Sequence, residues 1–434
     1  MEEKRAVGKY RWTILSLVFF ATTVNYLDRQ VISLLKDDYL EPIFKWSETD
    51  YAHIVVVFQI CYAVGMLGVG AIIDKIGTKL GYALSLTIWS LAAIAHALST
   101  GTLGFMAARG MLGVSEAGNF PAAIKTVAEW FPKKERALAT GIFNSGTNVG
   151  AIIAPLTVPL IAVAWGWQWA FILTGVIGLV WLLFWCFIYH SPNVHKKLSK
   201  EELAYINSDH EEPAENADKP EKVSWFKLLT FKQTWAFFLG KLLTDPVWWF
   251  YLFWLPSFLN KQYHMTKTDV ALPIAIVYTL TTIGSIFGGW LSGYFIKKGM
   301  AVYKARKIAM LIFALCALPV MLAQTLGQYS YWYAIIIIGI AASAHQAWSA
   351  NIFTTASDMF PKKAVASVTG IGGMAGAVGG ILIASLAGAL LDHFKALGSI
   401  ETGYHIMFLV CGSAYLIAWV IFNILAPKMK QAEI

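Results

Sequence analysis

The chain has 434 residues, of which 57% are hydrophobic and only 14% are charged, and its formal net charge is +8. This composition lies far outside that of soluble proteins and excludes a soluble class. Apolar stretches of about 20 residues recur along the chain, the length that spans roughly 30 Å of hydrocarbon as a helix. The sequence therefore predicts an all-α membrane protein that crosses the bilayer many times.

Twelve transmembrane helices are predicted, in two halves of six. The predicted spans are 12–35, 51–73, 80–100, 102–126, 137–163, 167–190, 232–259, 269–297, 305–326, 331–355, 364–391 and 404–426. The polar stretch between the sixth and seventh spans is rich in Pro, Glu and Lys, which is typical of a linker. We therefore expect an N-terminal six-helix half at 1–190, a cytosolic linker at 191–231 and a C-terminal six-helix half at 232–434.

The positive charges are distributed unevenly between the predicted loops. If both termini face the cytosol and residues near span ends are counted with the adjacent loops, 26 of the 34 Lys and Arg residues lie on the cytosolic side and 5 on the opposite side. The remaining three, Arg29, Arg109 and Lys241, lie well inside spans. The positive-inside rule then predicts cytosolic N- and C-termini. The same asymmetry accounts for the basic net charge, so no nucleic-acid partner is expected.

Away from their ends, spans one, four and seven contain six charged side chains, which are Asp28, Arg29, Arg109, Glu116, Lys241 and Asp245. A charge at the bilayer centre costs about 2.5–3.5 kcal/mol on insertion scales, so each is a candidate functional residue. Arg109 and Glu116 are seven residues apart, or two helical turns, and can face one cavity at different depths. The alternative is that these charges only pair with one another, as Lys241 and Asp245 can at i,i+4 spacing.

The predicted cytosolic loop between spans two and three contains a motif with two glycines, an acid and two lysines, at Gly70, Asp74, Lys75, Gly77 and Lys79. The glycines permit a tight turn between helices, and the charges can pair with neighbouring helix ends and so latch one conformation. A simple solvated turn is the alternative. In spacing, side and span number the motif resembles the signature loop of the major facilitator superfamily, which implies the latch.

The two halves are related by an internal repeat. The tetrapeptide Phe-Pro-Lys-Lys at 131–134 returns at 360–363, an offset of 229 residues, and seven residues of span five match span eleven at the same offset. Glycines at helical spacing in both spans, Gly141, Gly146, Gly150, Gly370, Gly373, Gly376, Gly379 and Gly380, allow close helix approach. Parallel repeats of six spans are typical of secondary transporters that rock about a central site.

A narrower resemblance comes from four stretches, at 25–29 (NYLDR), 109–121 (RGMLGVSEAGNFP), 129–132 (EWFP) and 344–349 (AHQAWS). Together they resemble the anion:cation symporter family of the same superfamily, over essentially the whole chain. That family includes bacterial hexuronate, galactonate and glucarate transporters and the animal sialin group. The His345-Gln346 element and residues 245–248 most resemble hexuronate transporters.

This resemblance implies roles for the embedded residues. Asp28 and Glu116 match the carboxylates that take up the coupling protons, whereas Arg29, Arg109 and Tyr62 match substrate-contacting positions. An Arg side chain can bind a sugar carboxylate in a bidentate fork. Further side chains able to bind sugar hydroxyls, ring faces or charge are Tyr26, Asn25, Gln346, Trp348, His345 and Lys241.

The predicted function is proton-coupled import of a sugar acid, a hexuronate such as galacturonate or glucuronate, by alternating access across the cytoplasmic (inner) membrane of a bacterium. The alternatives are transport of another organic anion, such as galactonate or glucarate, and an uncoupled facilitator or exchanger. No HExxH or GxSxG motif and no Cys/His cluster occurs in the sequence, so we expect no enzyme, no cofactor and no metal. The expected partners are the anionic sugar acid, protons and the lipid bilayer, with the chain acting as a monomer.

Overall fold

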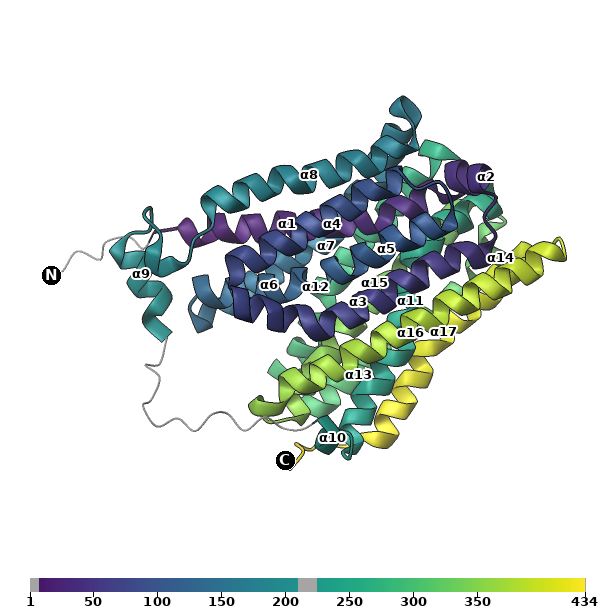
Figure 1. The fold of residues 1–434 in the computed structure, drawn as a ribbon. Helices are drawn as coiled ribbons and strands as arrows, with labels where there is room; N and C mark the ends of the chain where they lie inside the picture. The colour runs from purple at the N-terminus through teal and green to yellow at the C-terminus, as the bar shows by residue number, and fades with distance from the viewer. Residues whose placement is uncertain (1–7, 210–224, 434) are drawn as a thin grey trace. The chain divides into compact units, whose positions relative to one another are not determined.

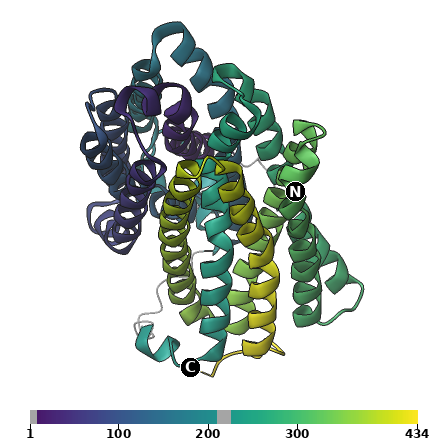
Figure 2. The same ribbon diagram turned by 90° about the vertical axis from the view of Figure 1, so that its right-hand side faces the viewer.

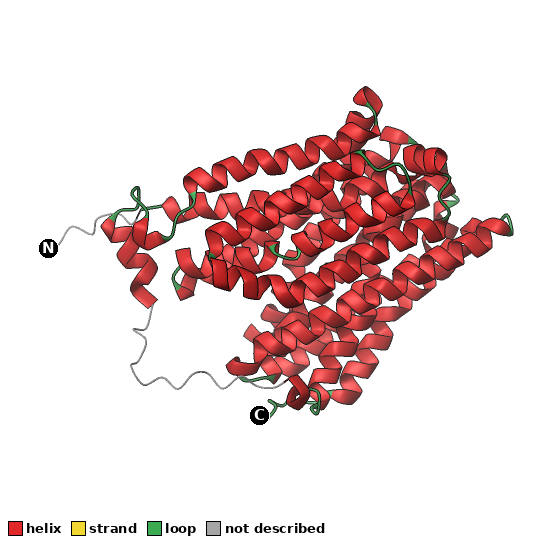
Figure 3. Ribbon diagram, viewed as in Figure 1, coloured by secondary structure: helices red, strands yellow, loops and turns green. Residues whose placement is uncertain are grey.

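In the computed structural model, residues 8–209 and 225–433 are described, apart from the side chains of residues 71, 74, 133, 134, 136–138, 362, 363 and 366. The described residues form helices joined by short loops (Figure 1). Figure 3 shows no strand among them. The prediction of an all-α protein is confirmed.

The helices follow the predicted spans closely. The first half contains α1 (Tyr10–Leu35), the π-helix η1 (Lys36–Leu40), α2 (Glu41–Phe44), α3 (Glu48–Ile76), α4 (Thr78–Ala97), α5 (Thr102–Glu116), α6 (Asn119–Trp130), α7 (Lys133–Trp165) and α8 (Trp167–Ile188). The short helices η2 (Pro192–Val194), α9 (Lys200–Ile206), η3 (Asn207–Asp209) and α10 (Trp225–Leu228) follow. The second half contains α11 (Lys232–Tyr263), η4 (Lys267–Val270), α12 (Ala271–Lys297), α13 (Val302–Ala317), η5 (Leu318–Leu322), α14 (Ala323–Gly327), α15 (Tyr331–Met359), α16 (Lys362–Ala396) and α17 (Ile400–Leu425).

Nine helical segments in the described part of the chain are long and apolar enough to cross a membrane. The three other predicted spans correspond to α1, the pair α5 and α6, and α11, and these three contain all six embedded charges. Charged side chains lower the mean hydropathy of a helix, and α5 is also short because it ends at Glu116. The helices that hydropathy identifies least well are therefore those that carry the candidate functional residues.

The chain divides into two units. Unit 1 comprises residues 1–32 and 57–217, and unit 2 comprises residues 33–56 and 218–434. The segment 33–56 contains the last residues of α1, then η1 and α2, and the first residues of α3. The ends of two N-terminal helices thus group with the C-terminal helices.

Unit 1 relies on glycine at its close helix contacts. In unit 1, α4 packs against α8 and α5. A Cβ atom at Gly113 in α5 would overlap the carbonyl oxygen of Phe58 in α3, and Cβ atoms at Gly146 and Gly150 in α7 would overlap backbone carbonyls of α1. Gly141, by contrast, faces open space. The small residues at two of the three predicted positions in α7 therefore permit close approach.

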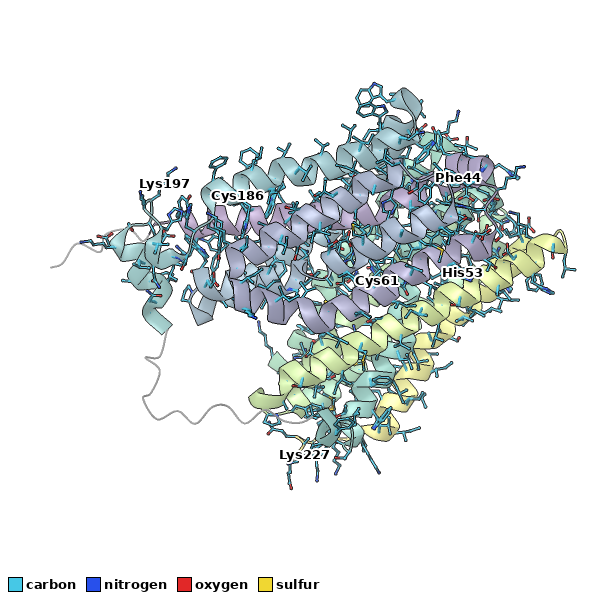
Figure 4. The ribbon with its side chains drawn as sticks, viewed as in Figure 1. Phe44, His53, Cys61, Cys186, Lys197 and Lys227 are labelled. Atoms are coloured by element: carbon cyan, nitrogen blue, oxygen red, sulfur yellow. The ribbon has the colours of Figure 1, made fainter. Side chains whose placement is uncertain are left out.

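Unit 2 is organised around α11, α12 and α15. Helix α11 packs against α16 and α17, which lie beside it in Figure 2, and α12 packs along α15. Cβ atoms at Gly284 and Gly288 in α12 would overlap the α15 backbone at Ser343 and Ala347. All four cysteines of the chain are free, including Cys61 and Cys186, which are labelled in Figure 4.

Candidate functional site

A buried ion pair joins the first and fourth predicted spans. The Nε of Arg29 in α1 donates to Oε2 of Glu116, the last residue of α5, at 2.6 Å. The two side chains are 1% and 0% exposed. The sequence had placed Glu116 on the same helix face as Arg109, but its direct partner in the structure is Arg29. The second carboxylate oxygen of Glu116 accepts no hydrogen bond from the described residues.

Aromatic rings surround the guanidinium group of Arg29. The ring centroids of Tyr26 and Tyr62 lie 4.8 and 4.7 Å from its central carbon, and that of Phe58 lies 5.5 Å away. A guanidinium group over a ring face is attracted by the ring quadrupole. Tyr26 and Tyr62 are only half-buried. The rings therefore orient Arg29 while leaving phenol groups in reach of a ligand.

Arg109 lies next to Arg29 and is also buried. Its Nη2 donates to the backbone carbonyl of Arg29 at 3.1 Å, and its guanidinium lies 5.6 Å from the ring of Phe58. The close approach of α5 to α3 at Gly113 brings Arg109 near this ring. Two guanidinium groups thus share one aromatic neighbour.

Asp28 and Asn25 are buried on α1, one turn apart. Neither the carboxylate oxygens of Asp28 nor the amide group of Asn25 has a hydrogen-bond partner among the described residues. The Thr174 hydroxyl of α8 and the Arg109 guanidinium lie near the Asp28 carboxylate. Unit 1 therefore contains a buried carboxyl group with free hydrogen-bonding capacity beside the two arginines.

In unit 2, Lys241 and Asp245 form the i,i+4 ion pair that the sequence offered as an alternative. Their Nζ and Oδ2 atoms lie 2.7 Å apart, and the ammonium group lies 4.0 Å from the ring centroid of Phe353. A Cβ atom at Gly376 in α16 would overlap the Asp245 carboxylate, so the glycine gives this side chain its space. The charge of Lys241 is therefore already balanced within its own helix.

Two of the three predicted residues of α15, His345 and Trp348, contact Tyr415. The His345 Nδ1 lies 2.8 Å from the Tyr415 hydroxyl, and its ring stacks on Trp248 at 5.5 Å. Trp348 is buried and meets the ring of Tyr415 edge-on at 5.7 Å. Gln346 is half-buried. His345 and Trp348 are held in place by their neighbours, so they can present fixed groups to a ligand.

The loop motif between α3 and α4 contains the tight turn that its glycines predict. Gly77 has φ +87°, a left-handed conformation that favours glycine, and it joins the two helices. Gly70 is half-buried and Lys75 is exposed, while Lys79 Nζ lies 3.1 Å from His190 Nε2. The side chain of Asp74 lies outside the described residues, so the latch stays a prediction.

The structure also reveals a group of charges in the stretch between the first and second predicted spans. Lys36, in η1, is fully buried and bonded to Glu48, with Asp37 and Glu41 nearby. The only local signal is the density of charges between residues 36 and 50. A charged loop is ordinarily solvated, and nothing in the local sequence reveals the distant residues that cover this one.

Comparison with known proteins identifies the family. Residues 18–384 match the model of the Major Facilitator Superfamily. The chain belongs to the Major Facilitator Superfamily. Among its relatives in that superfamily, the hexuronate transporter of Escherichia coli K12 is 32% identical over 390 residues, covering 89% of each chain. The galacturonate transporter of Dickeya chrysanthemi is 33% identical over 336 residues, covering 77% of this chain and 95% of the relative.

Solved structures agree on the fold of this superfamily member. A bacterial homologue of the human lysosomal transporter Spinster aligns with TM-score 0.78 at 17% identity, covering 99% of this chain and 100% of that one. The D-xylose-proton symporter aligns with TM-score 0.77 at 14% identity, covering 98% and 100%. The fold of twelve transmembrane helices is thus confirmed, and the chain is a multi-pass membrane transporter and not an enzyme.

Proposed function

We propose that this transporter imports a sugar acid, a hexuronate such as galacturonate or glucuronate, together with protons. The observation that carries the proposal is the buried Arg29–Glu116 ion pair with Arg109 beside it. The relatives at 32% and 33% identity, which are named for hexuronate and galacturonate, support this substrate class. Their bacterial sources support the inner membrane of a bacterium as the location.

The substrate carboxylate competes with Glu116 for Arg29 in this mechanism. A guanidinium group binds a carboxylate best through two parallel N–H···O bonds. Arg29 uses its Nε on Glu116 in the present structure. An arriving sugar acid must therefore replace Glu116 or share Arg29 with it, and Arg109 supplies a second positive charge at the same place.

Protonation of Glu116 resolves this competition. A neutral carboxyl group holds a guanidinium less strongly than a carboxylate does, so a proton on Glu116 releases Arg29 for the substrate. Anion and proton then enter together, and the loaded carrier reorients without an added unpaired charge in the membrane. Asp28, which is buried beside Arg109 without a hydrogen-bond partner, is the second proton-binding group.

The sugar hydroxyls and ring faces require neutral partners. Tyr26, Tyr62 and Asn25 supply these on unit 1, and Gln346, His345 and Trp348 supply them on unit 2. Lys241 contributes to the substrate only if its pairing with Asp245 loosens, because the two groups are already 2.7 Å apart. The repeat of six and six spans fits transport by alternating access.

A second candidate substrate class is the aldaric acids. The probable galactarate/D-glucarate transporter of E. coli K12 is 28% identical and covers 100% of this chain and 98% of the relative. The second positive charge that Arg109 adds beside Arg29 suits a substrate that carries two carboxylates. The two classes differ in one terminal group, so a substrate panel separates them.

Uptake into proteoliposomes tests the proposal. Galacturonate, glucuronate, galactonate, glucarate and a neutral hexose are supplied with and without an inward proton gradient. We expect uptake of a hexuronate to rise with the gradient and no uptake of the neutral hexose. Uptake that ignores the gradient would favour an uncoupled facilitator or exchanger, and a preference for glucarate would move the substrate to the aldaric acids.

A further inference from the structure

Six charged residues form a second cluster, separate from the proposed substrate site. This group, which we call the charge cluster, consists of Lys36, Asp37, Glu41, Glu48, Lys261 and Lys395, and all six belong to unit 2. Four of them lie in the segment 33–56, which contains the π-helix η1, a rare element that is frequent at functional sites. Phe44 and His53, labelled in Figure 4, mark the course of this segment.

Lys36 is the centre of the charge cluster. Its ammonium group donates to both carboxylate oxygens of Glu48 at 2.8 Å and to the Ser257 hydroxyl of α11 at 2.7 Å. The side chains of Lys36 and Glu48 are both 0% exposed. A buried charge is tolerated only where it is paired and hydrogen-bonded, as this one is.

The Ser257 hydroxyl links Lys36 to a second set of ion pairs. Its hydroxyl donates to Asp37 at 2.7 Å, and Lys261 Nζ lies 3.2 Å from Asp37 and 3.0 Å from Glu41. Lys395 of α16 reaches the other oxygen of Glu41 at 2.7 Å. Every member of the charge cluster therefore has an oppositely charged partner.

The same segment is fixed to α16 by its backbone. The Asp392 carboxylate accepts hydrogen bonds from the backbone N–H groups of Glu48 and Thr49, both at 2.8 Å. It thereby binds free N–H groups at the start of α3. A Cβ atom at Gly388 would overlap Ala52, so the two helices lie very close here.

A metal site is the rival interpretation of the acidic groups. The carboxylates of Asp37, Glu41 and Glu48 come within 4.8 Å of one another. The ammonium group of Lys36 lies among them, at 2.8 Å from Glu48, 3.5 Å from Asp37 and 3.8 Å from Glu41. Because lysine already supplies the positive charge, the group is a set of ion pairs.

We propose that the charge cluster is a lock that holds residues 33–56 on α11 and α16 and that it opens once in every transport cycle. The physical reason lies in the course of the chain, since α1 and α3 continue from this segment into unit 1. Alternating access moves the two halves of such a transporter against each other. Because unit 2 holds this segment while its helices continue into unit 1, a movement of one half against the other pulls on the segment, and release of the segment allows the movement.

Cysteine labelling tests the lock. Ser33, one turn before Lys36, is 1% exposed, and a Ser33→Cys variant in a background without native cysteines reports its accessibility. A membrane-impermeant maleimide is applied to right-side-out and to inside-out vesicles, so the labelled side is measured directly. We expect slow labelling in the parent and about tenfold faster labelling from one side when Lys261→Gln is added, the change expected when about 1.4 kcal/mol of lock stability is lost.

Matched variants decide what such a change means. Lys261→Arg keeps the charge and should label as slowly as the parent, whereas Ser257→Ala removes the connecting hydroxyl and should label faster. Lys395→Gln is the matched control, because Lys395 is 42% exposed, so its ion pair with Glu41 contributes little to the lock and this variant should label at close to the parent rate. Parent-like labelling of both Lys261→Gln and Ser257→Ala, in variants that still catalyse substrate counterflow, would overturn the proposal. The readout needs no substrate, so its outcome is independent of the proposed hexuronate specificity.

Discussion

The embedded charges of unit 1 and the charge cluster of unit 2 differ in how many of their polar atoms have hydrogen-bond or ion-pair partners. In unit 1, both oxygens of Asp28 and one oxygen of Glu116 have no hydrogen-bond partner among the described residues. In the charge cluster of unit 2, Lys36 and Asp37 each have several partners at short distance, and both oxygens of Glu48 accept hydrogen bonds from Lys36. Residual bonding capacity suits a group that must accept a proton or meet a ligand, while saturation suits a contact that only opens and closes. We therefore assign transport chemistry to the first group and conformational control to the second.

The largest effect is expected from removing a carboxylate from the charge cluster. Replacing Glu48 by Leu leaves the Lys36 ammonium group buried without its main carboxylate partner. Loss of one partner of a buried pair costs about 3–5 kcal/mol. We expect a large fall in thermal stability of the purified protein, measured by the loss of monodisperse protein after heating.

The control for this variant is Lys395→Ala. Lys395 is 42% exposed, and an exposed ion pair contributes about 0–1 kcal/mol. Its thermal stability should stay close to that of the parent. Equal stabilities of the Glu48 and Lys395 variants would show that the charge cluster is hydrated and would remove the contrast between the two groups.

The two groups also differ in how far the sequence predicts them. Asp28, Arg29, Arg109 and Glu116 are conspicuous because a charge in an apolar span is costly, so composition alone identifies them. Lys36 is not conspicuous, because it lies beyond the end of a predicted span in a charged stretch. Its ammonium group donates to the hydroxyl of Ser257, which is 221 residues away in the chain.

Pairing within the embedded set was only partly predictable. The i,i+4 spacing of Lys241 and Asp245 places the two side chains on one helix face, and the structure shows this pair. The pairing of Glu116 with Arg29 depends on how α5 approaches α1, which no single-helix pattern contains. The twelve spans were predictable because hydrophobic length is a property of each segment alone.

The next largest effect is expected at Arg109. In Arg109→Lys, a point charge replaces the planar fork that binds a carboxylate through two bonds. A lost hydrogen bond to a charged group costs about 1.5–3 kcal/mol, so the apparent affinity for the sugar acid should fall about 10- to 100-fold. Equilibrium binding of the sugar acid measures this change. Parent-like thermal stability would show that the fold is retained, and normal affinity would assign Arg109 a structural role.

A change of coupling rather than affinity is expected at Glu116. Glu116→Gln keeps the shape of a protonated carboxyl group but cannot release a proton. Arg29 then stays available, so counterflow of the sugar acid at equal pH on both sides should continue. Net uptake should no longer respond to an inward proton gradient. A variant that is still driven by the gradient would leave Asp28 as the group that couples transport to protons.

The smallest effect is expected for pH: opening of the lock should not change when the pH of the medium is varied. The pKa of the Asp37 carboxyl is lowered, because the charges of Lys36 and Lys261 outweigh the opposing effect of burial. The pKa of Lys36 is raised, because the surrounding carboxylates, first Asp37 and Glu48, outweigh its burial. Because its pKa is lowered, the Asp37 carboxylate stabilises the lock at any pH above the ordinary carboxyl pKa near 4, and this contribution is lost only in stronger acid. Because its pKa is raised, the Lys36 ammonium group stabilises the lock at any pH below the ordinary lysine pKa of about 10.4. Both contributions are therefore constant between pH 5 and pH 8.

Labelling of the Ser33→Cys variant should accordingly proceed at one rate across that range, once corrected for the reactivity of the maleimide with a free thiol. The other groups that face Lys36 are Glu41, Glu48 and the Tyr404 hydroxyl. Uptake of the sugar acid through Asp28 and Glu116 should vary with pH in the same vesicles. If labelling and uptake instead change together at one pH, the two groups of charges are coupled, and proton binding at the site opens the lock.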